Sequence, residues 1–266
     1  MKILPLTKFF FRETVKERFF WGVVVFDLLF CFFAYYLSEI TAGDNVKIAM
    51  DFILSFQFFI VAIFSVLVSW NAIQSDLNNK VIYLIYSKPV TKRDYLAAKS
   101  LSLYLALVVL VFILTVLNSS AFFVINRISK LYVPHVIVIH RLAVFGVSLV
   151  FMGMMLVSLS LMFSVSFSSN IVSLFVSFIV FIIGLELSPV KELVVSSELA
   201  SEINKIVVRT AYYVFPNFSL FDVKPYVVHK SVNMPFAYVA GIFVYSLIWS
   251  FIFLLLTYMI FRNKEF

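Results

Sequence analysis

Six long apolar stretches divide this chain, and each is long enough to cross the hydrocarbon core of a bilayer as a helix. Such a crossing takes about 20 mostly apolar residues in helical conformation. The stretches are continuous and do not alternate, which argues against the strands of a membrane barrel. We therefore predict an all-α membrane protein with six transmembrane helices. The predicted spans run approximately from Phe19 to Ser38, Phe52 to Ile73, Ser100 to Ile125, His140 to Phe163, Ser168 to Leu187 and Phe236 to Phe261.

The composition agrees with a membrane protein and excludes several function classes. Of the 266 residues, 63% are hydrophobic and 13% are charged, whereas a soluble domain is roughly 45–50% apolar and about 25% charged. The formal charge of +7 resides on segments that flank apolar stretches, so it indicates anchoring at anionic lipid headgroups and no nucleic-acid partner. The single cysteine, Cys31, excludes an intrachain disulfide and a cysteine-based zinc site.

Basic residues are unevenly distributed between the two sides of the predicted bundle. They are frequent before the first span, between the second and third spans, and after the last span, whereas the first two loops on the other side hold few. The positive-inside rule then places both termini in the cytosol. We expect a multi-pass protein of the cell (inner or plasma) membrane, with residues 1–266 forming a single transmembrane domain.

Two amphipathic segments lie outside the predicted spans. Residues 1–18 are predicted to form an interfacial helix, with an apolar stripe in the acyl boundary and a charged face among the headgroups. Residues 188–235 should face outward, with Pro189 at the first position of an amphipathic helix that ends near Pro216. The apolar stripe of the interfacial helix comprises Phe11, Val15 and Phe19. Its charged side chains include Arg12, Glu13, Lys16 and Arg18.

One carboxylate falls deep within an apolar stretch. Asp27 lies roughly 12 Å inside the first predicted span, at 1.5 Å per helical residue. An unpaired carboxylate at that depth is costly, so it should face the bundle interior, a polar cavity, or a partner such as Ser65 or Ser69. Two interpretations remain open: Asp27 belongs to a translocation pathway, or it makes a structural hydrogen bond between helices.

No motif for ATP hydrolysis is present. A phosphate-binding P-loop ends in Gly-Lys followed by Ser or Thr, but none of the six glycines is followed by lysine. We therefore expect that the chain is not an ATPase. The three histidines do not form a metal or catalytic set at any recognised spacing, and no metal site is predicted.

The segment from Asp76 to Lys99 is a polar, basic island between the second and third spans. Its second half, from Ser87 to Lys99, reads SKPVTKRDYLAAK and resembles the type-2 permeases of ATP-binding-cassette (ABC) exporters. In that family a serine, a basic residue, a proline, a hydrophobic residue, a serine or threonine and an arginine precede an aromatic residue and a lysine that opens the third span. The order of spans and amphipathic segments is similar over essentially the whole chain. The run from Phe215 to Asp222 also resembles permeases linked to maturation of the copper centre of nitrous oxide reductase.

This resemblance implies a type V ABC transporter fold in which residues 74–99 form the coupling segment. A short helix between the second and third spans would dock into a separate ATPase, with Pro89 setting its start and Thr91 capping it. ATP and Mg²⁺ would be bound by that ATPase and no cofactor by this chain, which would pair with a second permease copy in a homodimer. The implied coupling residues are Lys88, Pro89, Val90, Thr91, Lys92, Arg93, Asp94, Tyr95 and Lys99. A membrane anchor for a partner complex, and a membrane-embedded lipid-modifying enzyme, remain the alternatives.

Overall fold

The computed structural model describes residues 3–40, 45–78, 90–128, 139–167, 169–197, 201–228 and 234–263. Every regular element in these residues is helical, and six helices are long and apolar enough to span a membrane. This confirms the predicted all-α, six-span architecture. The spanning helices are α2 (Arg18–Ile40), α3 (Asn45–Asn78), α5 (Lys92–Ile128), α6 (Ile139–Ser166), α7 (Asn170–Ser196) and α10 (Phe236–Asn263). The shorter elements are α1 (Ile3–Lys16), α8 (Glu202–Val214), η1 (Ser219–Phe221) and α9 (Lys224–Val228).

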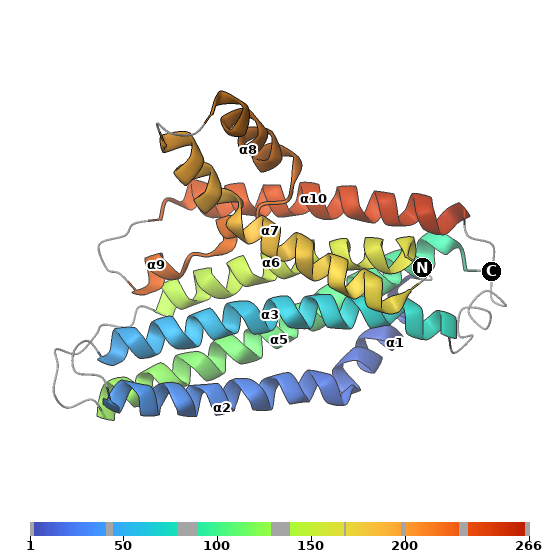
Figure 1. The fold of residues 1–266 in the computed structure, drawn as a ribbon. Coiled ribbons are helices and arrows are strands. Elements are labelled where there is room, and N and C mark those ends of the chain that lie inside the picture. Colours follow the sequence, from blue (N-terminus) through green and yellow to red (C-terminus); the bar gives the residue numbers. More distant parts are fainter. Residues whose placement is uncertain are drawn as a thin grey trace.

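The long helices run side by side, and the two chain termini lie at the same end of the bundle (Figure 1). Helix α6 is the central element, because it contacts α3, α5, α7 and α10. Helix α2 lies at the edge of the bundle and packs against α3, α5 and α1. We refer to the end that holds the termini as the basal end.

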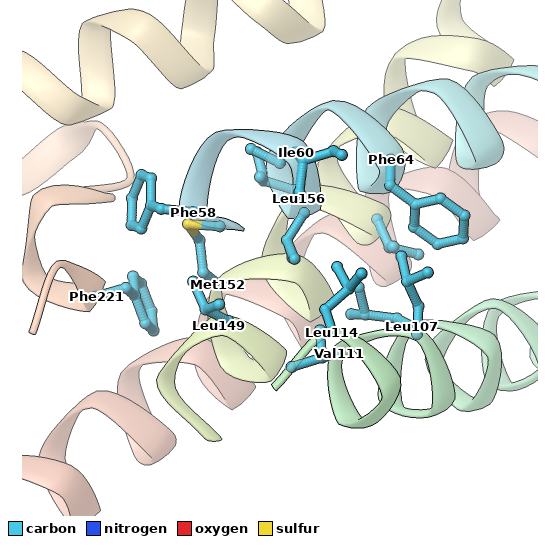
Figure 2. Packing of buried hydrophobic residues seen from close by; sticks show 14 of the residues in the cluster. Phe58, Ile60, Phe64, Leu107, Val111, Leu114, Leu149, Met152, Leu156 and Phe221 are labelled. Atoms are coloured by element: carbon cyan, nitrogen blue, oxygen red, sulfur yellow. The ribbon is translucent and has the colours of Figure 1, made fainter. Parts of the chain in front are cut away.

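Interlocking side chains from α3, α5 and α6 form the middle of the apolar core, and Phe221 of η1 lies beside them (Figure 2). Lipid tails are as apolar as these side chains, so close packing and not hydrophobic transfer holds such helices together. Gly153 of α6 permits a close approach to both α5 and α3. A Cβ atom at this position would lie 2.6 Å from Leu107 Cδ2 and 2.9 Å from Ser65 Oγ. The core residues labelled in the figure are Phe58, Ile60, Phe64, Leu107, Val111, Leu114, Leu149, Met152, Leu156 and Phe221.

Polar side chains add direct bonds between α3 and α6. The hydroxyl of Ser160 donates to the carbonyl of Val66 at 3.1 Å, and that of Ser164 donates to the carbonyl of Trp70 at 3.1 Å. In the opposite direction, Gln74 Nε2 donates to the Ser164 carbonyl at 2.8 Å. Hydrogen bonds of this kind join transmembrane helices where small residues let their backbones come close.

A helix, α1, is present where the interfacial helix is predicted; it bends into α2 at Glu17 and packs along α5. Its buried side chains are Thr7, Phe10 and Thr14. The predicted apolar stripe lies one position further along the helix, and there Phe11 and Val15 are only half-buried. The charged residues Arg12, Glu13, Lys16 and Arg18 are all exposed, as expected for the polar face.

The helix predicted to begin at Pro189 does not begin there. Helix α7 continues through Pro189 to Ser196, and the separate outer helix is α8, which begins after the capping residue Ser201. Proline lacks the N–H that would bond to the carbonyl of Leu185, so it removes one bond without ending the helix. The predicted end near Pro216 is confirmed, because α8 ends at Val214 with Phe215 as its C-cap.

Helix α8 contacts α7 and buries none of its own side chains. The chain then returns to the bundle, where Phe218 and Phe221 become fully buried. The N–H of Phe218 donates to the carbonyl of Gly184 at 3.0 Å. This segment therefore closes the end of the bundle that is remote from the termini, whereas α8 remains outside it (Figure 1).

Candidate functional site

A buried ion pair joins α3 to α5 at the basal end of the bundle. Lys99 Nζ lies 2.8 Å from Asp76 Oδ2, and the two side chains are 6% and 4% exposed. The hydroxyl of Tyr95 donates to the same carboxylate oxygen at 2.5 Å. Tyr95 and Lys99 are four residues apart on α5, so their side chains share one face of the helix. Both of them therefore reach the carboxylate near the end of α3.

Aromatic rings from two further helices enclose this ion pair. Phe10 of α1 lies under the Lys99 ammonium group, with 4.2 Å from Nζ to the ring centroid. The Tyr95 ring meets Phe10 edge-on at 5.8 Å and stacks on Phe261 of α10 at 5.8 Å. We call Phe10, Asp76, Tyr95, Lys99 and Phe261 the basal clamp. It joins α1, α3, α5 and α10 at one point.

The charges of the basal clamp are balanced within it. Asp76 carries one negative charge and Lys99 one positive charge, and little of either side chain is exposed. Each charge needs the other, because removing one partner of a buried pair leaves an uncompensated charge at a cost of about 3–5 kcal/mol. A second donor on Asp76 and a ring beneath Lys99 further satisfy the two groups.

A side-chain cap sets the start of α5. The N–H of Asp94 donates to Thr91 Oγ1 at 3.2 Å, and the N–H of Thr91 donates to Asp94 Oδ2 at 3.2 Å. The Thr91 hydroxyl also donates to Asp94 Oδ2 at 2.8 Å. This reciprocal arrangement satisfies free N–H groups of the first turn, as in a capping box. Thr91 thus caps the third span itself, whereas the prediction had it capping a separate short helix between the second and third spans.

The two basic residues that follow the cap contact the end of α10. Lys92 Nζ donates to the carbonyl of Arg262 at 3.1 Å. Arg93 Nε donates to the hydroxyl of Tyr258 at 2.7 Å, and its guanidinium carbon lies 5.0 Å from the centroid of that ring. Arg93 remains exposed and Lys92 is half-buried, so cationic surface is retained beside the basal clamp.

The predicted coupling residues differ in where they lie and in how far they are buried. Lys88 and Pro89 lie outside the described residues, and Val90 directly precedes the capped turn. The stretch from Lys92 to Lys99 forms the first turns of α5 and is continuous with the third span, so this part of the predicted short helix is not a separate element. Tyr95 is fully buried and Lys99 is 5% exposed. These two residues hold helices together and do not present a surface to a partner.

Sequence reasoning did not identify the Asp76–Lys99 pair or the two phenylalanine rings around it. One signal was available: a carboxylate and a lysine stand at the two ends of the polar island, where consecutive antiparallel spans come back together. Phe10 and Phe261 carried no such signal, because the chain contains 33 phenylalanines.

Lys99 also interacts electrostatically with Glu17, at the bend between α1 and α2. Loss of surrounding water and the negative charge of Glu13 raise the pKa of Glu17, and Lys99 lowers it in part. Glu17 thus belongs to the electrostatic surroundings of the basal clamp. The bend that joins α1 to α2 therefore lies next to the basal clamp.

The prediction that Ser65 or Ser69 is the partner of Asp27 is wrong. The hydroxyls of Ser65 and Ser69 donate to backbone carbonyls of their own helix, those of Val61 and Ser65. The carboxylate oxygens of Asp27 are buried and have no hydrogen-bond partner in the described parts of the chain. Asp27 faces the bundle interior, as expected, but lies beside Asn118 of α5.

Comparison with known proteins identifies the family. The model of the family described as ABC-2 family transporter protein matches residues 10–266, which is nearly the whole chain. A search of curated proteins gave no match. The matched region includes the six spans and every residue of the basal clamp. The chain therefore belongs to the ABC-2 family of transporter proteins and is a membrane-embedded ABC permease.

Proposed function

We propose that this permease couples ATP hydrolysis by a separate ATPase subunit to export of a substrate, and that its coupling segment is the polar connection from α3 to α5. The basal clamp carries this proposal. It ties together the two helix ends from which the connection leaves and to which it returns, through the Asp76–Lys99 ion pair at 2.8 Å. A force applied to the connection would therefore act on both helices at once.

The basal clamp would spread this force to four helices. Tyr95 bonds to α3 and packs against both Phe10 of α1 and Phe261 of α10. Helix α5 is continuous over 37 residues, which is about 55 Å at 1.5 Å per residue. A tilt imposed at its capped start would be transmitted along the whole span, which is the type of rigid-body motion that switches transporters between states.

The basic surface at the start of α5 would meet an acidic surface of the ATPase. Arg93 uses one of its five N–H donors on Tyr258, and the guanidinium remains exposed. Arginine is well suited to bidentate contacts with carboxylates. Lys88 and Lys92 would add positive charge on the same short stretch. The positive-inside distribution supports a cytosolic position for this end and both termini.

The ATPase would hold ATP and Mg²⁺, and this chain would contribute the pathway. A second copy of the permease would complete that pathway, because α7 and α10 bury only 28% and 22% of their spanning windows within the chain. The rest of their surface is available to lipid and to another protomer. Export is the direction used by the permeases that the polar island resembles.

The proposal is tested by isolating the full-length tagged chain from membranes of its native host in mild detergent. We expect an ATPase with a P-loop to co-purify in stoichiometric amount, and its hydrolysis to change when the permease is removed. A chain that is isolated without any ATPase, and whose removal leaves membrane ATP hydrolysis unchanged, would contradict the proposal.

A further inference from the structure

A second polar cluster lies inside the bundle between α2, α3 and α5. The side-chain amide of Asn118 donates to Gln57 Oε1 at 2.9 Å, and Gln57 Nε2 donates to Thr115 Oγ1 at 3.1 Å. The thiol of Cys31 donates to Asn118 Oδ1 at 3.0 Å. These four side chains satisfy one another across three helices, as buried polar groups require.

Asp27 lies beside this cluster without joining its hydrogen bonds. It precedes Cys31 by one helical turn on α2 and has Asn118 as a neighbour. Its side chain is 1% exposed, and neither carboxylate oxygen accepts a hydrogen bond within the described residues. No cation in the described part of the chain forms an ion pair with it.

The surroundings of Asp27 leave room for one type of ligand. A carboxylate in the hydrocarbon region, with only the Asn118 amide beside it and no counter-ion in the described residues, is strongly disfavoured. Both oxygens are closed to a water-sized probe, so neither a metal ion nor a substrate group reaches them in this packing. A proton neutralises the group and needs no additional space.

We propose that Asp27 is a proton-binding site, protonated in the packing described here and deprotonated when α2 separates from α3 and α5. In the release step the O–H bond breaks, its electron pair stays on the carboxylate oxygen, and the proton passes to water that enters between the helices. Proton binding in the resting chain does not depend on the proposed transport function. Only the release step rests on it.

The position of α2 permits this separation. Only 33% of its spanning window is buried, and it lies along one edge of the bundle (Figure 1). A cavity of about 370 Å³ already opens between α2 and α5, and Cys31, Tyr35 and Ser120 are part of its lining. The thiol of Cys31 thus lies between this cavity and Asn118. A modest displacement of α2 would extend the cavity to the polar cluster.

The side chains of the neighbouring polar cluster do not provide a competing charge. Cys31 is the titratable neighbour on α2, and its thiol is a hydrogen-bond donor to Asn118. Gln57 on α3, and Thr115 and Asn118 on α5, are uncharged. A change of charge in this cluster would therefore be a change at Asp27.

Infrared spectroscopy of the full chain in lipid nanodiscs, without nucleotide, tests the site directly. The wild type should show the carbonyl band of a protonated carboxyl group, and Asp27→Asn should lose it. Asp51→Asn is the matched control, because Asp51 is exposed on α3, and it should retain the band. Asp27→Glu keeps the carboxyl group and should shift the band. Identical bands in wild type and Asp27→Asn would overturn the proposal.

The release step is tested in complex with the ATPase, by trapping the ATP-bound state. The carboxyl band should decrease, and the sole cysteine, Cys31, should react faster with a membrane-permeant maleimide. Asp27→Asn lacks the carboxyl group, so it should show no such decrease of the band. An unchanged band together with unchanged Cys31 reactivity in a trapped, transport-competent complex would overturn the release step. Failure to find any ATPase would instead contradict the transport function and leave the result from the resting chain intact.

Discussion

The ammonium nitrogen of Lys99 lies 2.8 Å from Oδ2 of Asp76, although the two residues are 23 positions apart in the sequence. The pair closes the polar connection between the second and third spans within the protein interior. Lys92 and Arg93, which precede Lys99 on α5, are held at the basal end by their contacts with α10.

Lys99→Met should destabilise the chain by about 3–5 kcal/mol, because it leaves the buried charge of Asp76 without a partner. Asp76→Asn should have a similar effect for the converse reason. The double variant has no unpaired charge, so its loss of unfolding free energy should be much smaller than the sum of the losses in the two single variants. Thermal or chemical unfolding of the purified chain in detergent gives the three free energies. Strictly additive costs would show that the two groups are not coupled.

Tyr95→Phe should cost about 1.5–3 kcal/mol, the range for a hydrogen bond to a charged group. The ring contacts with Phe10 and Phe261 remain, so the loss reports the hydroxyl alone. Tyr258→Phe is the matched control, since it removes the exposed bond to Arg93 and should cost less than about 1 kcal/mol. The same unfolding measurement applies. An equal decrease in the free energy of unfolding for the two variants would contradict a strong hydrogen bond from Tyr95 to Asp76.

Much of the fold follows from local sequence properties. The positions of the spans depend on continuous apolar runs, and the Thr91 cap depends on residues three apart, so both could be predicted. The helices extend beyond the predicted spans where polar side chains find hydrogen-bond or ion-pair partners within the protein. The charged side chain of Lys99 is buried because it forms an ion pair with Asp76 of α3. A local window of sequence does not show that the two residues are in contact.

In the outer segment, a local sequence signal gave a wrong prediction. Pro189 is a good first residue for a helix, but α7 continues through it, because the loss of a single backbone bond does not outweigh the remaining turns. The surroundings of Asp27 were also beyond prediction. Gln57 and Asn118 stand on different helices, and only the register of α2, α3 and α5 brings them together.

Gly184→Ala should destabilise the chain by about 1–3 kcal/mol through overpacking. A Cβ atom there would meet the carbonyl oxygen of Pro216 and lie 2.5 Å from Phe218 Cδ2, where the segment after α8 returns to the bundle. Gly241→Ala is the matched control. Nothing lies within 4 Å of a Cβ atom at Gly241, so this change should be neutral or stabilise α10 by up to about 1 kcal/mol. Melting curves for the two variants that coincide would contradict the close approach at Gly184.

The binding of the ATPase to the basal surface is measured most directly by reversing the charge of that surface. The double variant Lys92→Glu, Arg93→Glu should weaken ATPase binding by about tenfold or more, because like charges at an interface cost several kcal/mol. Lys205→Glu with Arg209→Glu makes the same change of charge on α8 and should bind normally. Tyr258→Phe removes the hydrogen bond between Arg93 and α10 without altering the charge of Arg93, and it should also bind normally.

The decisive measurement is the affinity of the purified ATPase for these variants reconstituted in nanodiscs, together with the ATPase rate of each complex. Loss of binding and of ATPase stimulation in the Lys92, Arg93 variant alone is the result we predict. Unchanged affinity and unchanged stimulation in that variant would contradict coupling through the polar connection between α3 and α5.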